Sequence, residues 1–152
     1  GGLALQFAAD ELRAKFEVAH AALTENGAAL EHVAPCLKAD SELVLLAVKQ
    51  NGGALVHASD TLARDRSFVF RAVQENGLVL RYVAEVFQAD YDIALAAAIQ
   101  NAGAVNWAVW ELKRDRGFIL EAIRANRDVI HHVFDWYMQD TEICEAAGIS
   151  RK

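Results

Sequence analysis

The sequence predicts an all-α protein, an α-solenoid built from six tandem copies of a 25-residue two-helix repeat. Three observations lead to this fold class. The 25-residue period runs without insertion or deletion from Gly2 to Arg151. Apolar residues within a copy follow helical spacing, and helices this short can bury their apolar faces only by stacking on neighbouring copies. The copies form one domain, residues 2–151, and comprise residues 2–26, 27–51, 52–76, 77–101, 102–126 and 127–151.

The period is carried by positions that keep the same character in every copy. The fourth position is always aliphatic, the eleventh and seventeenth are always apolar, and the twenty-first is always alanine. A position that stays small throughout indicates a point where two helices approach closely. The alanines are Ala22, Ala47, Ala72, Ala97, Ala122 and Ala147.

An aspartate precedes the second helix in five of the copies. Its carboxylate can accept hydrogen bonds from free backbone N–H groups and oppose the positive end of the helix dipole, so we expect these residues to be N-caps. The predicted N-caps are Asp40, Asp65, Asp90, Asp115 and Asp140.

An asparagine follows the same helix in five copies, and glycine comes next in three of them. Both residue types tolerate the left-handed conformation that ends a helix, so we expect these asparagines to close it. The predicted closing residues are Asn26, Asn51, Asn76, Asn101 and Asn126.

The first half of each copy is expected to break near its eighth residue. Pro35, the only proline, stands at the ninth position, where it would cost a backbone hydrogen bond unless a new helical turn begins there. Ser59 and Asp60 suit such a restart.

Residue size also alternates between odd and even copies, for example between Phe68 and Ile93 at the seventeenth position, which points to a true unit of 50 residues used three times.

The fullest copy reads GAALEHVAPCLKADSELVLLAVKQN, residues 27–51. Its spacing of Gly, Ala-Leu, Asp, Ala-Val and Asn resembles a tandem helical-repeat family, domain of unknown function 4116 (DUF4116). The resemblance covers nearly the whole chain and implies helical repeats, but no activity. The sixth copy departs from it at Gly148 and Arg151.

Composition limits the partners. A formal net charge of −6 opposes attraction to phosphate backbones, and only the fifth copy is basic, so the sequence argues against a nucleic-acid partner. No apolar stretch approaches the length of a membrane-spanning helix. We therefore expect a soluble, intracellular protein. An organelle stays open, because the chain begins with Gly1 and its only methionine is Met138, which is not how a translated gene product starts.

No pattern of catalytic or metal-binding residues stands out, so the sequence predicts no catalytic residues, no metal site and no cofactor. One aspartate per copy does not supply the converging oxygens that calcium requires. The histidines His32, His57 and His132 recur at the sixth position but offer too few convergent ligands for zinc. Cys36 and Cys144 lack metal-ligand spacing and are too few for a disulfide framework.

Two tryptophans occupy positions that are polar in most other copies: Trp110 at the ninth position and Trp136 at the tenth. Large aromatic residues at otherwise exposed positions mark candidate interface anchors, although they could also cover the end of the stack. Tyr91 and the ring position of Trp107 are further candidates.

The preferred interpretation is a non-enzymatic protein-interaction or scaffold subunit within a larger assembly. An accessory module of a larger enzyme or modifier is the alternative, and RNA binding is a distant third.

Overall fold

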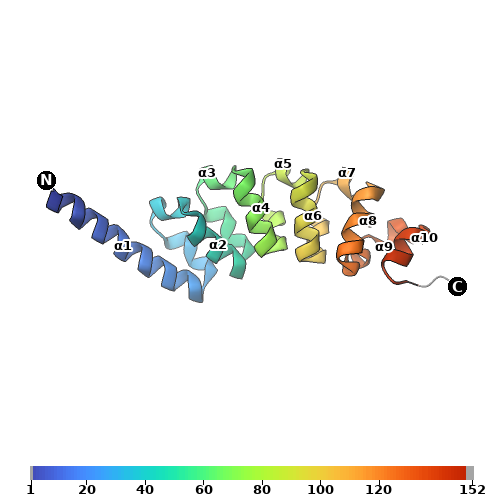
Figure 1. The fold of residues 1–152 in the computed structure, drawn as a ribbon, viewed down its shortest axis with the longest axis horizontal. Coiled ribbons are helices and arrows are strands. Elements are labelled where there is room, and N and C mark those ends of the chain that lie inside the picture. Colours follow the sequence, from blue (N-terminus) through green and yellow to red (C-terminus); the bar gives the residue numbers. More distant parts are fainter. Residues whose placement is uncertain (1, 150–152) are drawn as a thin grey trace.

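The computed structural model describes residues 2–149, with side chains from Asp10 onward, and within this range every regular element is a helix. Figure 1 shows an elongated stack whose helices follow one another along the long axis, with the two ends of the chain at opposite ends. The all-α repeat architecture expected from the sequence is therefore confirmed. No helix of the described residues is both long and apolar enough to cross a membrane.

The elements are α-helices (α) and 3-10 helices (η). In chain order they are α1 (Gly2–Glu25), η1 (Gly27–His32), η2 (Pro35–Ala39), α2 (Ser41–Gln50), η3 (Gly52–His57), α3 (Asp60–Ala63), α4 (Arg66–Glu75), η4 (Gly77–Tyr82), α5 (Glu85–Gln88), α6 (Tyr91–Gln100), η5 (Ala102–Trp107), α7 (Trp110–Lys113), α8 (Arg116–Ala125), η6 (Arg127–Val129), α9 (Ile130–Tyr137) and α10 (Thr141–Ala146).

Two layers run the length of the stack. The ten-residue helices α2, α4, α6 and α8 pack side by side in sequence order. The 3-10 helices that begin the copies form the second layer, each beside the next: η1, η3, η4, η5 and η6. A continuous core fills the space between the layers, including the fully buried Leu30, Leu43, Leu80, Ile93 and Phe118. The core is shared between neighbouring copies, as expected for a solenoid.

Copies two to five contain three elements rather than two. A 3-10 helix comes first, then a single helical turn, then the ten-residue α-helix. The break lies where the sequence placed it: Pro35 begins η2, and the Ser59 hydroxyl caps α3 by accepting a hydrogen bond of 3.3 Å from the Leu62 N–H. The expected restart is confirmed, while the helix before it has 3-10 geometry.

Packing repeats every two copies. The 3-10 helix η1 packs on α2 of its own copy, whereas η3 packs on the same α2 from the following copy. Likewise η4 and η5 both pack on α6. The even-copy helices α2 and α6 thus each contact two 3-10 helices, which gives the 50-residue alternation a physical basis.

The first copy differs from the expected two short helices, because it forms one continuous helix, α1. In the array, the 3-10 helix of an odd copy rests on the α-helix of the copy before it. No such helix is present among the described residues, so the first half of copy one has no equivalent surface to fold onto. Val18 is 71% exposed as a result, although Ile93 at the same repeat position is fully buried.

The sixth copy is also modified. Its 3-10 helix is reduced to η6 and continues directly into α9, and its last helix, α10, has six residues. Ser150 and Arg151, the last two residues of this copy, lie outside the described residues.

The five aspartates stand at the N-caps of α2, α4, α6, α8 and α10. In each case a carboxylate oxygen accepts a hydrogen bond from the N–H three residues further on. They are Asp40, Asp65, Asp90, Asp115 and Asp140.

Four of the asparagines are the C-caps of α2, α4, α6 and α8, as expected, but the left-handed conformation expected for them is wrong. Each has extended backbone, with φ between −151° and −144°, and its side-chain oxygen accepts from the N–H two residues on, which makes it the N-cap of the next 3-10 helix. Asparagine caps in this way because its side chain mimics a backbone turn. Among the described residues, only Gly148 has a positive φ. The five residues are Asn26, Asn51, Asn76, Asn101 and Asn126.

Candidate interaction surface

Trp110 and Trp136 meet at the junction of the fifth and sixth copies. Trp110 begins α7 and Trp136 lies near the end of α9, and their ring centroids are 5.1 Å apart at an interplanar angle of 79°. This edge-to-face contact is a favourable aromatic geometry. Both rings remain about half exposed, at 50% and 49%. The structure therefore joins the two tryptophans that the sequence singled out separately.

Two cations lie beside the pair. The Arg114 guanidinium carbon is 5.6 Å from the centroid of the Trp110 ring, and the Lys113 ammonium nitrogen is 6.0 Å from it. Such positions allow cation–π attraction. The Lys113 ammonium also donates a 3.3 Å hydrogen bond to the Asn106 carbonyl, which closes the short α7 onto η5.

An open groove of about 530 Å³ lies among these side chains and is lined by Trp110, Lys113, Arg114, Trp136 and Tyr137. The Tyr137 hydroxyl donates a 2.9 Å hydrogen bond to the Lys113 carbonyl, so the sixth copy is attached to the fifth beside the groove. Partial burial raises the pKa of Tyr137.

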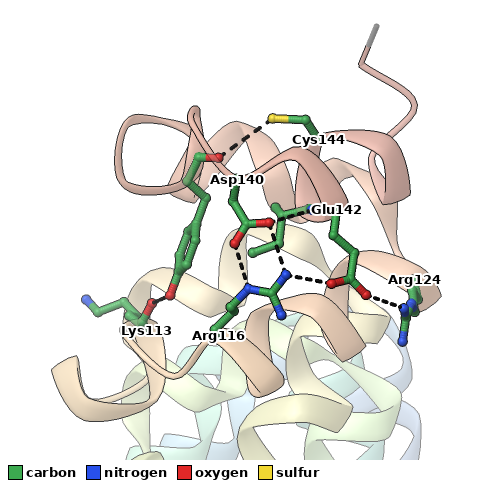
Figure 2. Close-up of polar contacts among 8 residues, drawn as sticks. Lys113, Arg116, Arg124, Asp140, Glu142 and Cys144 are labelled. Carbon is green, nitrogen blue, oxygen red and sulfur yellow. Dashed lines mark hydrogen bonds and ion pairs between the residues drawn. The ribbon is translucent and has the colours of Figure 1, made fainter. Parts of the chain in front are cut away.

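An ion-pair network also joins the same two copies, between α8 and the start of α10. Figure 2 shows Arg116 between Asp140 and Glu142, with Arg124 beyond Glu142. Arg116 donates to Asp140 at 2.6 Å and to Glu142 at 2.6 Å. These hydrogen bonds hold the pKa of Asp140 and of Glu142 below their usual values and raise the pKa of Arg116. The network links the fifth copy to the sixth through partly exposed ion pairs.

The same arrangement occurs one 50-residue unit earlier. Arg66 donates to Asp90 at 2.8 Å and to Asp92 at 3.3 Å, and the hydrogen bond lowers the pKa of Asp90. In the first copy, Phe16 occupies the position of these arginines. The network therefore joins copies three to four and five to six.

The other two predicted interface residues lie apart from the tryptophan pair. Tyr91 packs edge-to-face on Phe118 and donates to Glu121, which raises the pKa of Tyr91 to about 12. Trp107 is 39% exposed and lies under Arg81, whose guanidinium carbon is 4.9 Å from the ring centroid.

Lys113 and Arg114 were not predicted as site residues. The one sequence signal that could have found them was the net positive charge of the fifth copy.

Metal-ligating groups do not gather in the part of the chain that the structure describes: no three His, Cys, Asp or Glu side chains there are placed to hold an ion. Cys36 is exposed and Cys144 is buried, and both are free thiols. His132 contacts the Asn106 side chain at 3.0 Å.

A second groove, of about 580 Å³, opens at the other end of the stack. It lies between α1 and the first half of copy two, and Val18, Ala19, Ala22, Val33 and Leu37 are among the residues that line it. It exists because α1 does not fold back over its own copy. Nothing in the structure indicates what would cover it.

The sequence model of one family, described as "Domain of unknown function (DUF4116)", matches residues 15–63 and 65–113. These matches together cover more than half of the chain. The chain belongs to the DUF4116 family. Comparison with curated proteins and with solved structures found no match.

The two DUF4116 matches begin 50 residues apart, at residues 15 and 65. The first covers the second half of α1, all of copy two, and η3 with α3. The second covers α4, all of copy four, and η5 with α7. Each DUF4116 unit therefore contains one even-copy helix together with both 3-10 helices that pack on it. The family unit coincides with the packing unit, and Trp110 lies within the second match.

Proposed function

We propose that this DUF4116 chain is a non-enzymatic interaction subunit that binds a partner protein through the groove at Trp110 and Trp136. One observation carries the proposal: two large rings from successive copies meet edge to face and remain half exposed beside a groove. Tryptophan and arginine are the residues most often found at energetic hot spots of protein interfaces. Exposing two tryptophan rings to water is unfavourable in free energy, and partner binding would bury that apolar surface.

Contacts that link the two copies around the surface support the proposal. Tyr137 fastens α9 to α7, and Arg116 fastens α8 to Asp140 at the start of α10, so both tryptophans are held before any partner arrives. A preformed surface loses less conformational entropy on binding.

Quantitative capture of the natural partner tests this function. The Trp110→Ala and Trp136→Ala variants should each weaken binding by about 30-fold or more, the loss typical of a hot-spot residue. Trp107→Ala is the matched control, because Trp107 is an exposed tryptophan of the same copy outside the groove. Both groove variants should retain their helical circular dichroism. Full binding by a folded Trp110→Ala/Trp136→Ala double variant would refute the proposed surface.

A further inference from the structure

The positive charge of the fifth copy is concentrated at the tryptophan groove. The copy contains four cations, Lys113, Arg114, Arg116 and Arg124. Arg116 and Arg124 are both paired with carboxylates of the sixth copy. The charge that remains unpaired therefore belongs to the other two.

Lys113 and Arg114 have no carboxylate within ion-pair distance among the described residues, and both line the groove beside Trp110. A cation that has no carboxylate partner and lies next to a wide apolar ring is a site where a ligand carboxylate can form a charge-assisted hydrogen bond while neighbouring apolar groups cover the ring. The two cations and the two rings would thus contact different parts of the same ligand.

The surroundings limit how much negative charge a ligand can carry. Glu111 and Asp135, both exposed, are the chain neighbours of the two tryptophans, and the chain as a whole carries a formal charge of −6. A continuous polyanion such as a nucleic acid needs a longer line of cations than two. A peptide with one or two carboxylates fits the available charge better.

We propose that the groove takes an acidic peptide segment of the partner protein, with an apolar side chain against Trp110 and Trp136 and carboxylates at Lys113 and Arg114. This inference rests on the proposed function and adds the chemistry of the partner. The volume of about 530 Å³ is within the range of ligand sites and would accommodate a few side chains.

An array of short random-sequence peptides, made in pairs that differ only by Glu in place of Gln, tests the charge. The wild-type protein should bind the Glu member of a pair more strongly, and Arg114→Glu should weaken that binding about five- to tenfold. The preference should fade between about 0.15 M and about 1 M salt, where the screening length falls from about 8 Å to about 3 Å.

The matched control is Arg64→Glu. Arg64 occupies the same repeat position in copy three, is exposed and has no tryptophan pair beside it. This variant should bind like the wild type. An equal loss with Arg64→Glu would mean non-specific attraction and overturn the inference.

The remaining outcomes separate this inference from the proposed function. Equal binding of Glu and Gln peptides, binding of none, or tighter binding of a single-stranded oligonucleotide than of any Glu peptide overturns the acidic partner. Partner capture by the tryptophan variants is measured independently. A negative result with the acidic peptides therefore overturns the acidic ligand but leaves the proposed docking surface to be decided by partner capture.

Discussion

Gly77 lies directly against the carbonyl oxygen of Ala97, so closely that a Cβ atom at Gly77 would overlap that oxygen. Gly27 and Ala47 have the same relationship in copy two. The glycines that begin copies two and four therefore allow the 3-10 helix to lie directly against the backbone near the end of the α-helix.

This contact predicts that Gly77→Ala destabilises the protein. The overlap is with backbone, which cannot rotate away, so we expect a loss of about 1–3 kcal/mol in the free energy of unfolding. Gly52→Ala is the control: the same repeat position has space for a Cβ there, with its nearest neighbour at 3.4 Å, and copy five already carries Ala102. Denaturant titration of both variants checks this, and equal losses would contradict it.

The continuous first helix makes a prediction about the seventeenth position. Ile93→Ala should cost about 2–5 kcal/mol, because Ile93 is fully buried. Val18→Ala at the same position of copy one should change stability by less than about 0.5 kcal/mol, because Val18 is exposed. Thermal and denaturant unfolding compare them. A large loss at Val18 would show that copy one folds back over its own helix like the others.

The side-chain oxygen and the side-chain nitrogen of the asparagines contribute separately to stability. Asn126 accepts from the Asp128 N–H and also donates to the carbonyls of Ala98 and Ile99, whereas Asn101 only accepts, from the Gly103 N–H. Asn126→Asp keeps the acceptor but sets a carboxylate against two carbonyls, so it should cost about 1–3 kcal/mol.

Asn101→Asp is the matched variant and should be nearly neutral, because its capping acceptor is retained and no donated bond is lost. Chemical unfolding of the two proteins provides the measurement. A loss at Asn101 as large as that at Asn126 would mean that the bonds between copies add nothing.

The Arg116 network predicts a loss of stability in acid. Its carboxylates have folded-state pKa values below the ordinary 3.8 of Asp140 and 4.5 of Glu142. Their contribution is therefore complete above these ordinary values and is lost as the pH falls through the lowered ones. Arg116→Gln should lower the Tm at neutral pH and flatten its decline between about pH 5 and pH 2.

Arg64→Gln serves as the control, because no ion pair of Arg64 is found among the described residues. Calorimetric scans across this pH range decide the matter. An unchanged acid profile in Arg116→Gln would assign the acid sensitivity to other carboxylates.

Much of the local structure could be read from the sequence. The aspartate positions lie at N-caps and the break at Pro35 is real, because capping and proline geometry depend on neighbours within a few residues. The asparagine conformation was missed because asparagine suits two local roles: a left-handed helix end and an extended cap of the next helix. Which role it takes depends on where the next 3-10 helix must lie.

The sequence by itself determined the period, the helical class and the alternation of odd and even copies, because each of these is written in residue type and spacing. Only the tertiary structure decided that copy one is a single helix, that η3 belongs to the helix before it, and that Trp110 meets Trp136 beside Lys113 and Arg114. The physical reason is that these features depend on contacts between copies, and such contacts are set by how the copies stack rather than by spacing within any one of them.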